Sequence, residues 1–174
     1  QSGKLEFESS SLKRFDSDDP ERSPILKYVP SWEGPHDADR CAAYPLQLIS
    51  PHPRYSFHTQ GDGKGSFVND VANHRVHIDD RDYWLVRMNP ADAAARGIAE
   101  NDLVEIYNDR GIVVGAARLT ECARPGVVHS YYGSAVYAPD GDPGDSGSPE
   151  LGGCVNVLTP SRMMIRRSHA QAAN

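Results

Sequence analysis

Short apolar runs separated by turn signals dominate this chain, and only one clear helix stands among them. The runs have the lengths and the residue types that are typical of strands. They lie at residues 46–49, 83–88, 103–107, 112–119, 127–132 and 155–158. Parallel winding needs a crossover helix between strands, and too few helices are present. The pattern therefore predicts a mainly β domain with short helices, closed or nearly closed into a barrel.

The one clear helix is predicted to begin after Asn89. The Asn89 side chain can cap the free amides of the first turn, and Pro90 suits the first helical position, where its missing N–H costs nothing. Gly97 can adopt the left-handed conformation that ends a helix. Residues 108–111 predict a tight hairpin turn in which Gly111 takes a positive φ and Arg110 points into solvent.

The first 43 residues differ in character from the rest, because they are rich in Ser, Asp and Pro, a composition that resists a packed core. Within them, residues 4–7 have the alternation of one short strand. We expect residues 1–43 to be an extended linker, or the end of a preceding domain, and residues 44–174 to form the barrel domain. A disordered arm is the alternative for the first part. A second polar stretch, 133–153, is a loop of a length that is usually functional or disordered.

Composition excludes several classes of protein. The 174 residues make one ordinary domain, and a net charge of −6 argues against binding free duplex nucleic acid. No stretch approaches the ~18 apolar residues of a membrane span. Cys41, Cys122 and Cys154 form no C-x-x-C pair, which argues against a zinc ribbon or iron–sulfur site and favours a reducing cytoplasm over a disulfide framework. The start at Gln1, without Met or a signal pattern, suggests a piece of a longer protein, whose other parts could carry a signal.

Six short motifs occur in an order and spacing typical of one family. They lie at residues 89–93, 97–98, 102–104, 108–111, 125–128 and 152–159. Together they resemble the last domain of the DMSO-reductase-type molybdopterin oxidoreductases, and residues 2–7 resemble the segment that leads into it. The resemblance covers most of residues 44–159. Within the family, segments 50–54, 57–59 and 74–76 are most similar to the transhydroxylase large subunits.

The resemblance implies a double-psi β-barrel of the aspartate-decarboxylase-like kind. It also implies a bis-molybdopterin guanine dinucleotide cofactor with Mo or W, shared with domains absent from this chain. The family's metal ligand and any iron–sulfur cluster lie upstream. The isolated chain is therefore expected to carry no catalytic residue and no protein-bound metal, and to be inactive alone. The implied partners are the upstream domains of the same enzyme and an iron–sulfur electron-transfer subunit.

The first candidate site is the polar loop after the first strand. A pterin dinucleotide offers a pyrophosphate, ring nitrogens and ribose hydroxyls, which require hydroxyl donors, backbone amides and cations on a fixed loop. The expected contacts are Ser50, His52, Arg54, Ser56, His58 and Thr59. The family usually has Thr-Gly-Arg here, where this chain has Ser50-Pro51-His52. A polar surface loop is the alternative, and two histidines without a third ligand are weak evidence for a metal site.

The second candidate site lies in residues 152–159. Paired glycines let a backbone approach a ligand closely, and Asn156 offers an acceptor and two donors suited to a pterin edge, the role the resemblance assigns to it. The expected contacts are Gly153, Asn156 and Thr159. The alternative is a glycine turn leading into an edge strand. Tyr131 and Tyr132 fall where the family has a strand end that faces the cofactor, although aromatic residues in a barrel are usually core.

Two other functions compete with cofactor binding. One is a free-standing double-psi barrel that acts as a protein-interaction module, which needs neither the 152–159 motif nor a start without Met. The other is a self-contained barrel enzyme that matures by cleavage before a serine at a Gly-Ser step. Such self-cleavage would split the polypeptide, so the intact mass of the purified chain tests it.

Overall fold

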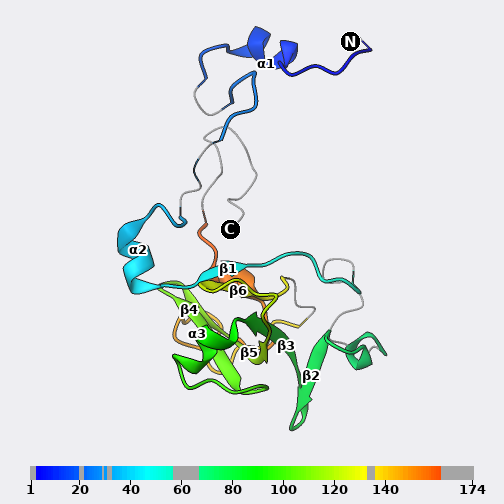
Figure 1. The fold of residues 1–174 in the computed structure, drawn as a ribbon, viewed down its shortest axis with the longest axis vertical. Coiled ribbons are helices and arrows are strands. Elements are labelled where there is room, and N and C mark those ends of the chain that lie inside the picture. The colour runs from blue at the N-terminus through cyan, green and yellow to red at the C-terminus, as the bar shows by residue number, and fades with distance from the viewer. Residues whose placement is uncertain are drawn as a thin grey trace.

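The computed structural model describes residues 3–19, 22–28, 30, 33–56, 67–132 and 136–161. Strands predominate among the described elements. They are β1 (Gln47–Ile49), β2 (Arg75–Ile78), β3 (Arg81–Met88), β4 (Leu103–Asn108), β5 (Gly111–Leu119) and β6 (Val127–His129). The helices are α1 (Ser10–Phe15), α2 (Ala38–Ala43) and α3 (Pro90–Ala94), with two 3₁₀ helices, η1 (Phe67–Asp70) and η2 (Val155–Leu158). Figure 1 shows α1 at the far end of the molecule from the sheet and α2 beside the strands.

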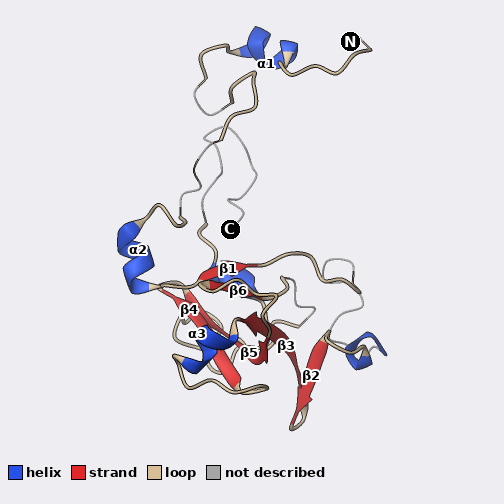
Figure 2. Ribbon diagram, viewed as in Figure 1, coloured by secondary structure: helices blue, strands red, loops and turns tan. Residues whose placement is uncertain are grey.

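The described strands form one curled, mixed sheet (Figure 2). Its order is β1-β6-β3-β5-β4, and β2 pairs with β3 off this path. β1 pairs with β6, and β3 with β5, in parallel, whereas the β4–β5 and β2–β3 pairs are antiparallel. The chain passes from β3 to β5 through only the short helix α3 and the strand β4. The prediction of a mainly β fold with short helices is confirmed, and parallel pairing arises here without a long crossover helix.

β3 and β5 lie at the centre of the sheet and bury both of their faces. Successive side chains point to opposite faces of a strand, so each strand contributes to two clusters. One cluster contains Tyr83, Leu85, Val114 and Ala116, and the other contains Val86, Met88, Ala93 and Val128. A third cluster joins β5 to η2 through Val113, Val155 and Leu158. Burial of each such aliphatic side chain stabilises the fold by roughly 1.5–3 kcal/mol.

Helix α3 begins and ends where the sequence predicts. The side chain of Asn89 accepts a hydrogen bond from the Ala91 amide at 2.9 Å, and Pro90 occupies the first helical position. The Asn89 amide group also donates to the Ala123 carbonyl oxygen at 2.9 Å, which ties the cap to the segment before β6. Gly97 has φ +67°, the left-handed stop that was expected.

The β4–β5 hairpin turns at residues 108–111 as predicted, but Gly111 does not take a positive φ. The side chain of Asn108 accepts a hydrogen bond from the Arg110 amide at 2.9 Å and closes the turn instead. A Cβ at Gly111 would lie 3.3 Å from Val157 Cγ2, so the glycine makes room for η2. Arg110 does not point into solvent, since it binds Glu33 and the Leu158 carbonyl oxygen.

Residues 155–158 form the 3₁₀ helix η2, and the prediction of a last strand there was wrong. Val155 and Leu158 are both buried in the third cluster, at a spacing of three residues that matches the 3₁₀ repeat and not the two-residue repeat of a strand. Strand β2 was missed, because its Arg-Val-His-Ile sequence is only half apolar. Residues 4–7 form no strand, although the neighbouring Glu8 makes an isolated bridge with Ile25.

Candidate functional site

The first candidate loop runs beside the segment that follows β6. The Ser130 amide donates to the Ile49 carbonyl oxygen at 3.1 Å, and the Tyr132 amide donates to Pro51 at 3.2 Å. The parallel pairing of β1 and β6 therefore continues past the ends of both strands. Residues 50–52 and 130–132 leave the sheet together at its carboxyl edge.

Tyr132 connects this loop to the second candidate segment. Its hydroxyl lies 2.7 Å from His52 Nε2 and also contacts Nδ1, and the two ring centroids are 4.5 Å apart. The same residue packs against the cluster that contains Val155 and Leu158 of η2. His52 of the first predicted set and the cluster that holds η2, which carries Asn156 of the second set, thus meet at Tyr132.

Trp84 on β3 is the centre of a buried aromatic group beneath both segments. Only 1% of Trp84 is exposed, and its ring centroid lies 4.8 Å from that of His74 and 5.6 Å from that of Tyr131. The guanidinium carbon of Arg75 stands 4.0 Å from the Trp84 ring centroid, close enough for a cation–π interaction. The indole Nε1 is buried and has no hydrogen-bond partner among the described residues.

Gly153 is required by this packing as well as by its own backbone conformation. Its φ is +83°, and a Cβ there would lie 2.0 Å from Cδ1 of Trp84. No side chain fits that space. Gly153 therefore lies directly against Trp84, which brings residues 152–154 down onto the aromatic group. Its predicted contact with a ligand stays a prediction.

Glu150 is a buried residue beside the second candidate segment that sequence reasoning missed. It is 1% exposed, and its carboxylate accepts hydrogen bonds from the amides of Ala138 at 2.9 Å, Gly152 at 2.8 Å and Cys154. These bonds fix the described part of the polar loop 133–153 to the start of the second candidate segment. The sequence gives no indication of this burial, because Glu150 is one of four acidic residues in a Gly- and Pro-rich stretch.

Asn156 is exposed on η2, and its side-chain amide makes no hydrogen bond within the described part of the chain. Its backbone carbonyl oxygen accepts hydrogen bonds from the amide of Thr159 at 3.1 Å and from the Thr159 hydroxyl at 2.8 Å. The Thr159 hydroxyl thus closes the end of η2. Burial raises the pKa of the neighbouring Cys154 thiol, which agrees with a packing role for that cysteine.

The remaining predicted residues lie along the first loop. Ser50 is half-buried, Arg54 is exposed with its guanidinium carbon 5.4 Å from the Tyr55 ring centroid, and Ser56 Oγ is buried without a partner among the described residues. His58 and Thr59 lie outside the described residues.

Arg87 on β3 and His129 on β6 form a pair that adjoins these segments. A guanidinium nitrogen of Arg87 lies 3.4 Å from His129 Nδ1, and another donates to the Asn73 carbonyl oxygen at 2.6 Å. Burial lowers the pKa of His129, and the charge of Arg87 lowers it further. Burial also lowers the pKa of Arg87 from its ordinary value. His129 is therefore biased toward its neutral form, and Arg87 supplies the positive charge of this pair.

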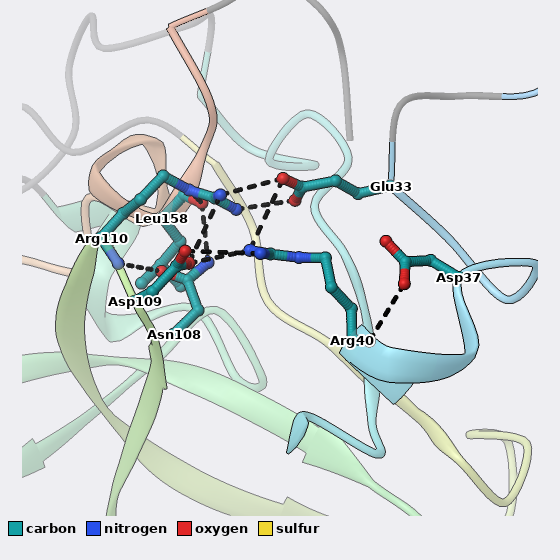
Figure 3. Close-up of polar contacts among 7 residues, drawn as sticks. All are labelled: Glu33, Asp37, Arg40, Asn108, Asp109, Arg110 and Leu158. Atoms are coloured by element: carbon teal, nitrogen blue, oxygen red, sulfur yellow. Dashed lines mark hydrogen bonds and ion pairs between the residues drawn. The ribbon is translucent and has the colours of Figure 1, made fainter. Parts of the chain in front are cut away.

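A separate cluster of ions contacts Leu158, the last residue of η2 (Figure 3). It joins Glu33 and Arg40, which precede the sheet, to Asp109 and Arg110 in the β4–β5 turn. No three His, Cys, Asp or Glu side chains in the described ranges converge as they would around a metal ion. No helix among the described residues is both long enough and apolar enough to span a membrane.

Comparison with known proteins points to one family. The model of the Molydopterin dinucleotide binding domain matches residues 46–173. The chain is 47% identical over 175 residues to the pyrogallol hydroxytransferase large subunit of Pelobacter acidigallici, a match that covers 99% of this chain and 20% of that protein. It is 33% identical over 163 residues to the dimethyl sulfoxide/trimethylamine N-oxide reductase of Cereibacter sphaeroides, covering 91% and 18% of the two chains.

A solved structure shares the fold. Acetylene hydratase from Pelobacter acetylenicus superposes with a TM-score of 0.64 at 14% identity, over 92% of this chain and 20% of that one. This chain therefore spans about a fifth of the length of the relatives that it matches.

Proposed function

Because this chain belongs to the molybdopterin dinucleotide-binding domain family, we propose that it works as that domain within a larger catalytic subunit, an oxidoreductase or hydroxytransferase of the DMSO reductase type. The match over residues 46–173 is the observation that carries this proposal. We place the limits of the domain at 44–174, preceded by a linker over 1–43. A cytoplasmic location is part of the proposal and rests on the three unpaired cysteines.

The cofactor that we propose is a bis-molybdopterin guanine dinucleotide with Mo or W, held between this domain and upstream domains of the same polypeptide. The fold that we propose for the complete domain is a double-psi β-barrel. Its support is the curled sheet with the parallel pairs β1–β6 and β3–β5. An iron–sulfur electron-transfer subunit is a further proposed partner.

The residues of the site fit such a group. A dinucleotide needs amide and hydroxyl donors, together with positive charge near its pyrophosphate. Asn156 presents an exposed amide without a partner in the described chain, and Arg54 presents an exposed guanidinium. The buried Ser56 Oγ, which likewise lacks a described partner, supplies an unsatisfied hydroxyl. These groups lie on segments that the structure joins through Tyr132 and Trp84.

In this role the chain binds and orients the cofactor. Gly153, Asn156 and Thr159 hold one part of the cofactor. Another part is held by Ser50, His52, Arg54, Ser56, His58 and Thr59. The molybdenum or tungsten centre supplies the redox or hydroxyl-transfer chemistry when bound. Tyr132 fixes His52 from one side. The isolated chain provides only one wall of the cleft, so we expect no turnover from it alone.

A free-standing interaction module remains the alternative from the sequence, but the relatives found are catalytic subunits and reductases, which favour the cofactor-binding role.

The proposal is tested in the full-length polypeptide with Asn156→Ala. Loss of a hydrogen bond to a buried pterin edge costs about 1–3 kcal/mol, or roughly 5- to 150-fold in affinity. We expect molybdenum or tungsten per polypeptide, and fluorescence of the released oxidised pterin, to fall together, while the melting temperature changes little. Glu105→Ala, a truncation of an exposed side chain on β4, is the matched control. Wild-type protein without pterin would refute the function, and full loading of Asn156→Ala would refute the role of that residue.

A further inference from the structure

Arg110 makes two kinds of contact at once (Figure 3). Its two terminal nitrogens donate to the two Glu33 carboxylate oxygens at 2.9 and 2.7 Å, and its Nε donates to the Leu158 carbonyl oxygen at 2.7 Å. The Arg110 side chain is 23% exposed and that of Glu33 is 25% exposed. This ion pair is therefore better shielded from water than most surface pairs, and its fork geometry is specific to arginine.

The contact falls on the end of η2. Leu158 is the last residue of that helix, and its carbonyl oxygen also accepts a hydrogen bond from the Asn108 side chain at 2.8 Å. Gly111, at the other side of the same turn, lies against Val157. The β4–β5 turn thus fixes the last two residues of η2 by two hydrogen bonds and one close packing contact.

Arg40 on α2 braces this arrangement. It lies 2.8 Å from Asp109 and 3.5 Å from Glu33, so two arginines and two carboxylates alternate with no net charge. The hydrogen bond between Arg40 and Asp109 raises the pKa of Arg40 and lowers that of Asp109. Arg40 and Asp109 are consequently both charged at neutral pH, and Arg40 holds Glu33 in place for Arg110.

The other end of η2 is fixed independently by Glu150, which accepts the amide hydrogens of Gly152 and Cys154. Asn156 lies between these two anchors, exposed, and its side-chain amide is not bonded to any described residue. Contacts that hold both ends of this four-residue helix restrict where its exposed side chain can point.

We propose that Arg110, braced by Glu33, is a positioning residue for the cofactor: through the Leu158 carbonyl oxygen it sets the place of η2 and so aims Asn156 at the pterin dinucleotide. This inference rests on the proposed function and adds the residues that preorganise it. Arg110 itself does not touch the cofactor. Lysine cannot replace it, because one ammonium group cannot bond the carbonyl and both carboxylate oxygens in the same geometry.

The test uses the full-length polypeptide with Arg110→Ala, Arg110→Lys and Glu33→Gln. We expect at least a fivefold loss of molybdenum or tungsten and pterin per polypeptide in both Arg110 variants, and a smaller loss in Glu33→Gln. Two controls separate positioning from general stability. Arg96→Ala removes an exposed arginine that, like Arg110, donates to a backbone carbonyl oxygen. That oxygen belongs to Asp92 in α3, away from η2. Val104→Ala destabilises the second cluster without touching η2.

Melting temperatures are measured on protein from a host that cannot make molybdopterin, so that the cofactor does not contribute to stability. Positioning predicts that Arg110→Lys loses cofactor while Val104→Ala, at an equal or lower melting temperature, retains it. If cofactor content follows melting temperature across all variants, or if Arg110→Lys is fully loaded, the positioning role is overturned. If Asn156→Ala is depleted while the Arg110 variants are loaded, the proposed function stands and this inference fails. If Arg110→Ala does not fold, the cofactor content of Arg110→Lys and Glu33→Gln decides whether Arg110 positions η2.

Discussion

Glu150 is the residue whose environment is least expected for its type. Glutamate is almost never fully buried in proteins, yet Glu150 is only 1% exposed. Three backbone amides stabilise its carboxylate, and no cation among the described residues pairs with it. The Glu150 backbone bridges to β5, since its amide donates to the Ile112 carbonyl oxygen at 2.9 Å and its carbonyl oxygen accepts from the Val114 amide at 2.9 Å. Beyond this bridge, the amides of Gly152 and Cys154 are bonded by the Glu150 carboxylate. The start of the 152–159 segment therefore depends on one side chain.

Glu150→Gln tests that dependence. A glutamine has one acceptor oxygen and turns an NH₂ group toward backbone donors, which leaves buried amides unpaired. We expect the free energy of unfolding to fall by about 1–3 kcal/mol in urea. We also expect Cys154, whose thiol lies in a buried setting next to this carboxylate, to react faster with a thiol reagent. Glu105→Gln, at an exposed position, should change stability by less than ~0.5 kcal/mol. Equal behaviour of the two variants would contradict the role of Glu150.

His129 is expected to make stability depend on pH. Burial and Arg87 lower its pKa in the folded state below the ordinary value of 6.5. The unfolded chain then binds a proton more readily, so this residue lowers stability as pH falls from about 7 through 6.5, until the folded pKa is reached. His129→Gln should remove this part of the pH dependence. Urea unfolding of both proteins at about pH 7.5 and about pH 5 measures it, and identical pH slopes would refute it.

Among the elements, α3 has the most completely specified ends. Asn89 caps it through its oxygen and bonds Ala123 through its nitrogen. Asn89→Ala loses both bonds and should lower stability by about 1–2 kcal/mol, whereas Asn89→Asp keeps the cap and should lose less. Thermal melting compares them, with Asp39→Ala in the first turn of α2 as a surface control. A loss in Asn89→Asp equal to that in Asn89→Ala would show that the cap contributes nothing.

The sequence predicts those elements whose signals are local. The cap at Asn89, the stop at Gly97 and the turn before Gly111 are each specified by neighbours in the chain, and each is found. Residues 155–158 form a 3₁₀ helix and not the predicted strand. Val155 and Leu158, three residues apart, share a face in the third cluster, and a short apolar run does not reveal that spacing.

The candidate site was predictable in part. The two polar segments can be recognised from their residue types and from the family resemblance. Their meeting at Tyr132 and Trp84, the bonds of Glu150 and the Glu33–Arg110 pair join residues far apart in the sequence. No local pattern contains such contacts, since they exist only once the sheet has formed.

At the scale of the whole molecule, the first 43 residues and the sheet share one cluster of charges. Glu33 and Arg40 come from the part predicted as linker, and Asp109 and Arg110 come from the β4–β5 turn (Figure 3). The segment around α2 is thereby attached to the edge of the sheet that holds η2. A change in the path of the preceding chain would act on the proposed cofactor site through this attachment.

The most direct measurement is the nucleotide and metal content of the purified full-length polypeptide. Acid hydrolysis releases the nucleotide half of a pterin dinucleotide, which chromatography then identifies and counts against the metal. The proposed bis-molybdopterin guanine dinucleotide predicts GMP and oxidised pterin, each at about two per molybdenum or tungsten atom. Recovery of metal and pterin without any nucleotide, or of neither pterin nor metal, would contradict the claim that this domain holds a molybdopterin dinucleotide.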